Sequence, residues 1–304
     1  MEYVGYERVL VPTDLSDFAA LALRYAALLR ERAGSALTLL YADETYLPVD
    51  LLEAPLGYYL ENAPQSREKL QTKFTEYAKA QIGGKFETVV VQDSPARAIL
   101  NTARSLRADL IIMGTHGRRG VRRAILGSVT ENVLHEAETP ILTVTPSLMA
   151  ARETAIKHIL CPVNFTYVAR ESLAQACRFA QMFGADLSVM YVVEGLPSDR
   201  ADQIESAFRQ WVDPQVRDQC KFTRLLVRDG DPAERVLGAA FEQNSDLIVV
   251  GAQHKFFSDA TVIGTTTQRI TRFSRCPVLT VVRKAKAEVF DRAEEKESAI
   301  AETM

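Results

Sequence analysis

The segment Asp109-Leu-Ile-Ile-Met-Gly-Thr-His-Gly117 joins an apolar run to two glycines. A short run that is apolar at every position is typical of a strand buried on both faces of a parallel sheet. The chain then reaches Ser128 through two further glycines and four arginines, and a helical pattern follows over 128–137. Strand, glycine-rich loop and helix in this order predict one βα unit of an α/β fold.

This segment belongs to a repeat that spans the chain. Asp109–Gly114 recurs as Asp246–Gly251 at an offset of 137 residues, whereas Arg8–Asp14 recurs as His158–Asn164 at an offset of 150. The second copy therefore lacks 13 residues between positions 45 and 90 of the first. Such a repeat predicts two homologous domains, at 1–150 and 151–283. The charge-rich tail, 284–304, is expected to be a frayed helix or disordered.

Within each copy, short aliphatic runs alternate with helical patterns. This alternation predicts right-handed βαβ crossovers, so each half should be a doubly wound α/β domain with a mainly five-stranded parallel sheet. Ser16 is a candidate N-cap for the first helix. The first copy has expected strands at 8–13, 36–42, 85–91, 109–114 and 140–145, and expected helices at 16–33, 65–82, 95–107 and 128–137.

The composition limits the possible partners. With 47% apolar residues, 25% charged residues and a formal net charge of -3, the chain lacks the overall positive charge of a nucleic-acid-binding protein. Neither a signal-peptide pattern nor an apolar run of about 18 residues occurs, so a cytoplasmic protein without a membrane segment is expected. The four cysteines are scattered, which predicts buried free thiols and neither a disulfide framework nor a zinc cluster.

The loop from Gly114 to Ser128 has the chemistry of a polyphosphate site. Its glycines allow close backbone approach, the following helix presents N–H groups and a positive dipole end, and its four arginines can pair with phosphate oxygens. In a doubly wound sheet this loop lies beyond the carboxyl ends of the strands, where ligands bind. A tight turn with a solvated basic face is the alternative. The loop lacks the lysine of a P-loop and is not the dinucleotide fingerprint.

Gly114-x-x-Gly117, nine residues, then Gly127-Ser128 resembles the G-2x-G-9x-G-[S/T] nucleotide motif of the universal stress protein family. The resemblance covers 5–146 and 155–283, so it implies a tandem-domain member with an adenine nucleotide α hydrolase-like fold. It also implies that the first domain binds ATP, with Mg²⁺ held near Asp14 and Ser128. The positions carried over as nucleotide contacts are Pro12, Thr13, Asp14, Ala42, Met113, Gly114, His116, Gly117, Gly127, Ser128, Val129 and Thr130.

Structural roles are the alternative for several of these residues: Asp14 and Ser128 could be helix caps, and Thr13 a turn residue. The second copy departs from the motif, because His254 replaces the second glycine and Asn164 replaces Asp14. The nine residues that follow His254 carry one charge of each sign, where the first copy carries four positive charges. We therefore predict that the second domain binds ATP weakly or not at all.

Three functions remain open on the sequence. The first is an ATP-dependent sensor with little or no hydrolysis, since no catalytic base beyond Asp14 and no loop lysine can be identified. The second is a slow ATPase, and the third is an interaction scaffold without nucleotide. Enzymes on the related electron-transfer-flavoprotein or nucleotidyl-transferase sheets would need first-strand motifs that Pro12–Ser16 does not match.

Two other segments carry predictions. The apolar, aromatic insertion 46–60 could be a lid or contact surface, or could pack against its own domain. The last strands, 140–145 and 277–282, are expected to pair and form an internal pseudo-dimer, as family members do in dimers. A homodimer of two chains and an unidentified protein partner are further expectations.

Overall fold

A computed structural model describes residues 5–44, 56–116, 126–145, 154–195, 200–216, 220, 222–252, 254–257 and 260–282. Gly117, the four loop arginines, residues 46–55 of the apolar insertion and the tail from 283 onward lie outside these residues. The first half contains β1 (Arg8–Pro12), α1 (Asp17–Ala33), β2 (Ala36–Ala42), α2 (Leu56–Gln81), β3 (Glu87–Val91), α3 (Pro95–Leu106), β4 (Leu110–Gly114), α4 (Ser128–Glu136) and β5 (Ile141–Val144).

The second half repeats this order with one addition, a hairpin between its fourth strand and last helix. Its elements are β6 (His158–Val163), α5 (Tyr167–Phe183), β7 (Asp186–Val193), α6 (Ala201–Val216), β8 (Phe222–Asp229), α7 (Pro232–Glu242), β9 (Leu247–Ala252), β10 (His254–Phe257), β11 (Ala260–Ile263), α8 (Thr265–Phe273) and β12 (Val278–Val282).

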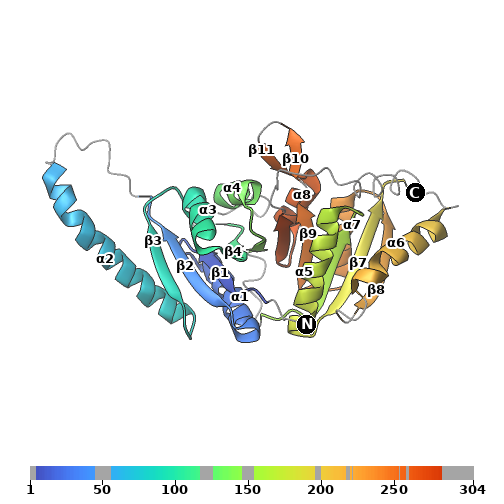
Figure 1. The fold of residues 1–304 in the computed structure, drawn as a ribbon, viewed down its shortest axis with the longest axis horizontal. Helices are drawn as coiled ribbons and strands as arrows, with labels where there is room; N and C mark the ends of the chain where they lie inside the picture. The colour runs from blue at the N-terminus through green and yellow to red at the C-terminus, as the bar shows by residue number, and fades with distance from the viewer. Residues whose placement is uncertain are drawn as a thin grey trace.

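The two halves share one ten-stranded sheet, ordered β3-β2-β1-β4-β5-β12-β9-β6-β7-β8 (Figure 1). In this sheet all pairs within each half are parallel, and β5 pairs with β12 antiparallel. The predictions of two doubly wound five-stranded halves and of paired last strands are both confirmed. Leu142 lies opposite Leu279 in the register. These two residues are also equivalent under the offset of 137, so the pseudo-twofold axis passes between them.

Alternating side chains explain why the strands are apolar at every position. Val9 and Val11 of β1 face the core on the α1 and α2 side, whereas Leu10 faces the core on the α3 and α4 side. The first of these cores continues across the seam, where the Tyr6 ring lies 5.4 Å from the Phe179 ring of α5 and the Tyr6 hydroxyl donates to Gln175. Burial raises the pKa of Tyr6 far above its ordinary value, so this hydroxyl stays a donor.

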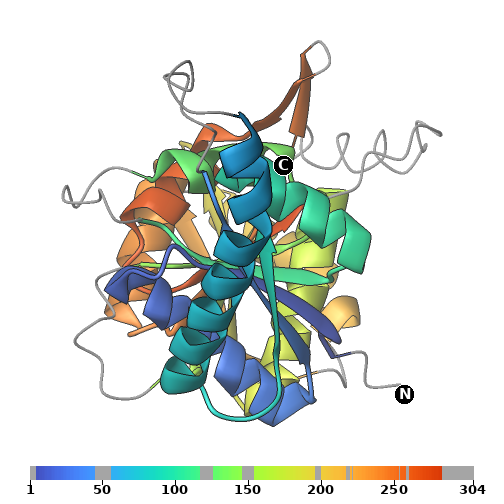
Figure 2. The same cartoon turned by 90° about the vertical axis from the view of Figure 1, so that its left-hand side faces the viewer.

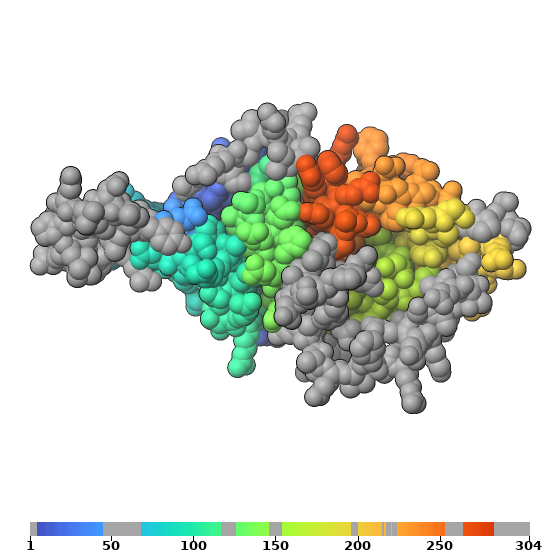
Figure 3. Space-filling view, turned by 90° about the horizontal axis from the view of Figure 1, so that it is seen from above, coloured from blue at the N-terminus to red at the C-terminus, as the bar shows by residue number. Residues whose placement is uncertain are grey.

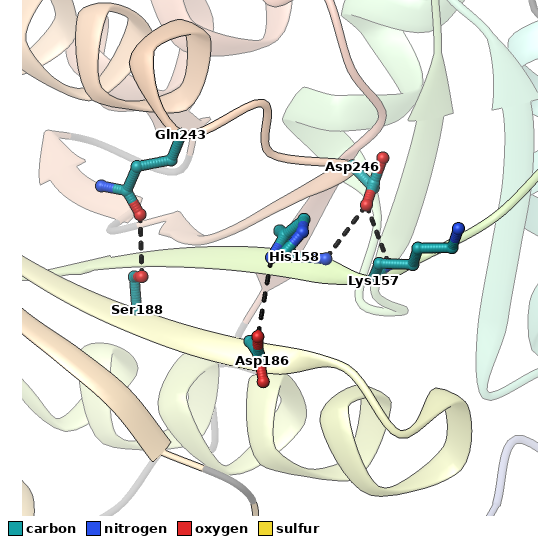
Figure 4. Close-up of polar contacts among 6 residues, drawn as sticks. All are labelled: Lys157, His158, Asp186, Ser188, Gln243 and Asp246. Carbon is teal, nitrogen blue, oxygen red and sulfur yellow. Dashed lines mark hydrogen bonds and ion pairs between the residues drawn. The ribbon is translucent and has the colours of Figure 1, made fainter.

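A carboxylate ties the start of the fourth strand to the start of the first in each half. Asp109 accepts hydrogen bonds from the backbone N–H groups of Glu7 and Arg8. Asp246 accepts them from Lys157 at 2.8 Å and His158 at 3.0 Å (Figure 4). The aspartate that opens the repeated Asp-Leu-Ile motif therefore has a structural role at the edge of the sheet opposite the carboxyl ends of the strands.

The main departure from the expected elements is α2. It begins at Leu56 and runs through Pro64, although proline is disfavoured inside helices and the expected helix started at 65. Residues 56–60 are therefore helix and not loop. Phe74, Ala78 and Ile82 bury the C-terminal part of α2 and the residue after it against the sheet. Figure 2 shows α2 lying across the outer end of the sheet, in front of β3, and Figure 1 shows its N-terminal end reaching away from β3.

Candidate functional site

The strand order reverses beside β1, whose neighbours are β2 and β4. Chains leaving β1 and β4 turn in opposite directions there, and the carboxyl ends of the strands at such a switch point are where open α/β sheets bind ligands. We call this place the β1/β4 crevice. Thr13 and Asp14 follow β1 directly, and Thr115 and His116 follow β4. The topology thus brings together two of the segments that the sequence assigned to nucleotide binding.

A network of short-range hydrogen bonds holds the turn after β1. The N–H of Leu15, a residue with φ of 65°, donates to Thr13 Oγ1 at 3.1 Å. Asp14 Oδ1 accepts from both the N–H and the hydroxyl of Ser16. Ser16 in turn accepts from Ala19 N and is the N-cap of α1, as expected. Asp14 is therefore not the cap itself, and its half-buried carboxylate is fixed just ahead of the N-terminus of α1.

The start of α4 is anchored to the end of β4 by two contacts. Gly127 N donates to Thr115 O at 2.8 Å, and Thr130 Oγ1 donates to Gly114 O at 2.9 Å. A Cβ at Gly127 would lie only 3.0 Å from Thr115 O, so glycine permits this close approach. Thr130 is buried, so its side chain positions the helix and its hydroxyl already has a partner.

Gly127, and not Ser128, is the N-cap of α4, and it provides no side-chain cap. The first turn of a helix leaves N–H groups without intrahelical partners, and these groups together with the helix dipole attract anions. Ser128 is exposed at the first helical position and Val129 is half-buried. The start of α4 can therefore offer backbone N–H groups and the Ser128 hydroxyl to one ligand.

Four other residues that the sequence predicted as contacts lie at the ends of β1, β2 and β4. His116 Nδ1 lies 2.9 Å from Thr115 Oγ1, which orients the half-buried imidazole. Ala42 ends β2 and Pro12 ends β1, both half-buried. The side chain of Met113 is buried in the core with Leu10, so only its backbone can border a ligand.

Tyr77 of α2 is a candidate site residue that the sequence did not identify. Its hydroxyl lies close enough to the Thr13 hydroxyl and the Asp14 carboxylate for both to affect its ionisation. Burial, with a smaller contribution from Asp14, raises the pKa of Tyr77, so the phenol stays protonated. Phe74, three residues earlier on the inward face of α2, could have indicated that Tyr77 also points to the sheet.

The second half lacks counterparts of the Thr13 and Tyr77 hydroxyls. The buried residues Phe208, Val212 and Val216 of α6 correspond to Phe74, Ala78 and Ile82. This correspondence sets Trp211 in the place of Tyr77, and the offset of 150 sets Val163 in the place of Thr13.

An aromatic cluster occupies this part of the second half. The Phe165 ring, equivalent to Leu15, packs 5.4 Å from the Trp211 ring and 4.6 Å from the Tyr191 ring. Asn164 Oδ1 accepts from Thr166 Oγ1 at 2.8 Å, so the Asp14 side-chain geometry is kept but its charge is lost. The polar pair of the first half is thus replaced by apolar packing.

The chain after β9 also differs from the phosphate loop of a nucleotide motif. β10 and β11 form an antiparallel ladder in which His254 pairs with Ile263 and Phe257 with Ala260. Backbone groups that pair across a ladder are not available to a phosphate. The hairpin therefore adds a second reason, besides the replacement of the second glycine by His254, to expect weak ATP binding by this half.

The starts of the two last helices touch across the seam. Gln268 Nε2 of α8 donates to Glu131 Oε1 of α4 at 2.7 Å. These residues are equivalent under the offset of 137, so the contact lies near the pseudo-twofold axis. In Figure 3 the green surface of the first half adjoins the orange-red surface of α8. A movement of α4 at the candidate site would consequently alter this contact with α8 of the second half.

Within the part of the chain that the structure describes, no three acidic, histidine or cysteine side chains gather as a metal site. Mg²⁺ is commonly held by one or two protein oxygens together with phosphates and water. The Asp14 carboxylate and the exposed Ser128 hydroxyl fit that donor set. Over the same described residues, no helix combines the length and hydropathy needed to cross a bilayer.

Comparisons with known proteins agree with this architecture. Universal stress protein MJ0577 of Methanocaldococcus jannaschii is 30% identical over 155 residues, which cover 46% of this chain and 96% of that protein. A universal stress protein of Mycolicibacterium smegmatis is 23% identical over 292 residues, covering 90% of this chain and 96% of the relative.

Among solved structures, a universal stress protein from Archaeoglobus fulgidus superposes with a TM-score of 0.70 at 20% identity, covering 92% of this chain and 99% of the other. This likeness shows the shared fold. The model of the Universal stress protein family matches twice, over residues 5–145 and 155–282. The chain therefore belongs to the universal stress protein family, with two family domains in tandem.

Proposed function

We propose that the first half binds ATP with Mg²⁺ at the β1/β4 crevice and uses its occupancy as a signal in a stress response. The observation that carries this proposal is the convergence of the Asp14 carboxylate, the Thr13–Tyr77 hydroxyl pair and the start of α4 at one switch point of the sheet. Asp14 suits ribose hydroxyls or a metal ion, and the start of α4 suits phosphates.

The second half supports the proposal by contrast. It has the same fold but carries Asn164, Val163 and Trp211 in place of Asp14, Thr13 and Tyr77. The Thr166–Asn164 bond keeps the geometry of the turn but not its charge. This is what we expect of a domain with a structural role. We infer that one chain binds one nucleotide.

Binding without rapid hydrolysis is the proposed activity. Asp14 Oδ1 already accepts two hydrogen bonds from Ser16, and among the described crevice residues only Asp14 and His116 could act as a base toward water. Phosphate release from saturating Mg-ATP should stay well below about 1 s⁻¹, the lower end of ordinary enzymes. Faster release would assign the chain to the ATPases.

The test is a competition assay against a fluorescent ATP analogue, with Asp14→Asn and Asn164→Asp as exchanged variants. Loss of a charge-assisted contact costs about 1.5–3 kcal/mol, so Asp14→Asn should weaken ATP binding by roughly 10- to 100-fold. Asn164→Asp should change it little. AMP and cAMP as competitors measure how much the terminal phosphates contribute.

Two outcomes would decide against the proposal. Equal affinities for ATP and AMP would remove the role of the α4 N-terminus in holding phosphates. Absence of nucleotide both in the purified protein and in the titration would leave an interaction scaffold as the function. A cytoplasmic location and the association of two chains remain predictions, to be checked by fractionation and light scattering.

A further inference from the structure

Three of the four cysteines gather in the core of the second half. Cys161 lies on β6, Cys177 on α5, and Cys220 between α6 and β8. The Sγ atoms of Cys177 and Cys220 are 3.0 Å apart, close enough for a thiol–thiol hydrogen bond. The residues are separated by 43 positions, so only the fold brings them together. The spacing of the cysteines in the sequence therefore gave no sign that Cys177 and Cys220 form a pair.

The two thiols of the pair differ in access to solvent. Cys177 is 1% exposed and packs within the main core, whereas Cys220 is only half-buried, in contrast to the expected burial of all four thiols. Cys161, 0% exposed, lies behind them and Cys276 belongs to a different core cluster. A small dissolved oxidant can reach Cys220 first, and Cys177 is then the adjacent thiol.

The ionisation of the two thiols follows the same order. The hydrogen bond with Cys177 lowers the pKa of Cys220 below its ordinary value. The same bond, together with burial, raises the pKa of Cys177 far above it. The thiolate is the reactive form of cysteine, so the more exposed Cys220 is the expected nucleophile and the adjacent, buried Cys177 the expected resolving thiol.

We propose that Cys177 and Cys220 form a reversible disulfide when the protein meets a peroxide. In the first step the Cys220 thiolate attacks one oxygen of hydrogen peroxide, the O–O bond breaks, and a sulfenic acid and hydroxide result. In the second step the Cys177 sulfur attacks the Cys220 sulfur, the S–O bond breaks, and water leaves with the Cys177 proton. The sulfur atoms are oxidised by two electrons in all, and the peroxide is reduced to water.

The required movement is small. A disulfide has an S–S distance of about 2.05 Å, so the two sulfur atoms must approach by about 1 Å. The bond would link α5 to the segment before β8 and close a long loop, which restricts the unfolded chain. This site is independent of the β1/β4 crevice, and its test does not depend on ATP binding.

The experiment treats the full-length protein with a few equivalents of hydrogen peroxide, blocks the remaining thiols with iodoacetamide, and analyses tryptic peptides without reduction. Trypsin should place each cysteine in its own peptide, because Arg or Lys residues separate all four. The expected product joins the peptide 171–178, which contains Cys177, to the peptide 218–221, which contains Cys220. The intact chain should lose about 2 Da, and a reductant should restore it.

Variants make the assignment specific. Cys220→Ser should abolish the mass loss, and Cys276→Ser, the matched control, should retain it. Because Cys177→Ser alters the core, its folding is checked by circular dichroism, and trapping of the Cys220 sulfenic acid by dimedone in this variant supplies an independent readout. Linkage of Cys220 to Cys161, a disulfide between two chains, or peroxide-treated protein with four free thiols would each overturn the proposal.

Discussion

Replacing Thr130 by valine removes one hydroxyl and keeps the shape of the side chain. Thr130 is 3% exposed, and its Oγ1 donates to Gly114 O at 2.9 Å. The loss of a buried hydrogen bond that leaves its acceptor unpaired costs about 1–2 kcal/mol. We expect Thr130→Val to lower the free energy of unfolding by this amount, which is measured by urea denaturation.

The second half provides a matched control. Thr267, 5% exposed, donates to Gly251 O at 3.0 Å at the equivalent position of α8. Thr267→Val should therefore destabilise the protein by a similar amount. In the first half the bond also fixes the start of α4, so this start is held less firmly in Thr130→Val. Ordering it again when ATP binds should cost about 1 kcal/mol, which is roughly a fivefold rise in the Kd for ATP.

Calorimetric titration of Mg-ATP into both variants compares the two positions directly. We predict equal destabilisation but weaker ATP binding only in Thr130→Val. If Thr267→Val weakens binding as much as Thr130→Val, the asymmetry between the halves is wrong. If neither variant changes the affinity, the start of α4 does not hold phosphate.

Three further predictions concern other contacts. Tyr77→Phe should raise the Kd for ATP about three- to tenfold in the same titration while changing the unfolding free energy by less than about 1.5 kcal/mol, because it removes only the hydroxyl that lies near Thr13 and Asp14; an unchanged Kd would place Tyr77 outside the site. Gln268→Glu should destabilise the protein by about 1 kcal/mol at pH 7, because two carboxylates then face each other. The exchange Glu131→Gln with Gln268→Glu should restore stability, and failure to do so would contradict the pseudo-twofold contact. Burial raises the pKa of Cys276 to about 11, so at pH 8 iodoacetamide should alkylate Cys220 well before Cys276, as followed by mass spectrometry; equal rates would contradict the burial.

The sequence predicted the architecture because its repeat carried two kinds of information. The continuous apolar runs at β1 and β4 predicted buried parallel strands, and the match between Asp109–Gly114 and Asp246–Gly251 predicted two such sheets. The pairing of β5 with β12 was expected from the family resemblance, because family members dimerise through this strand, and the pairing also covers an edge that would otherwise be open.

Details that depend on the relative placement of distant segments were not predictable. Tyr77 lies on α2, in the part of the repeat where the two copies lose their constant offset, so no motif marked it. The extension of α2 through Pro64 runs against the local preference of proline. Cys177 and Cys220 meet because the segment between α6 and β8 packs against the same core as α5.

The contact between Glu131 and Gln268 depends on where the pseudo-twofold axis passes. A residue touches its own counterpart only close to such an axis. The repeat made these residues equivalent, but only the register of β5 against β12 sets the axis near α4 and α8. The repeat likewise identified the Asp14 and Asn164 turns as equivalent. It did not show where either turn lies relative to the axis.

The stoichiometry of Mg-ATP binding to the full-length chain, measured by isothermal titration calorimetry and repeated with Asp14→Ala and Asn164→Ala, tests the proposed nucleotide site most directly. We predict one ATP per chain, lost in Asp14→Ala and unchanged in Asn164→Ala. Two equivalent sites per chain, or a single site that survives Asp14→Ala and disappears in Asn164→Ala, would contradict it.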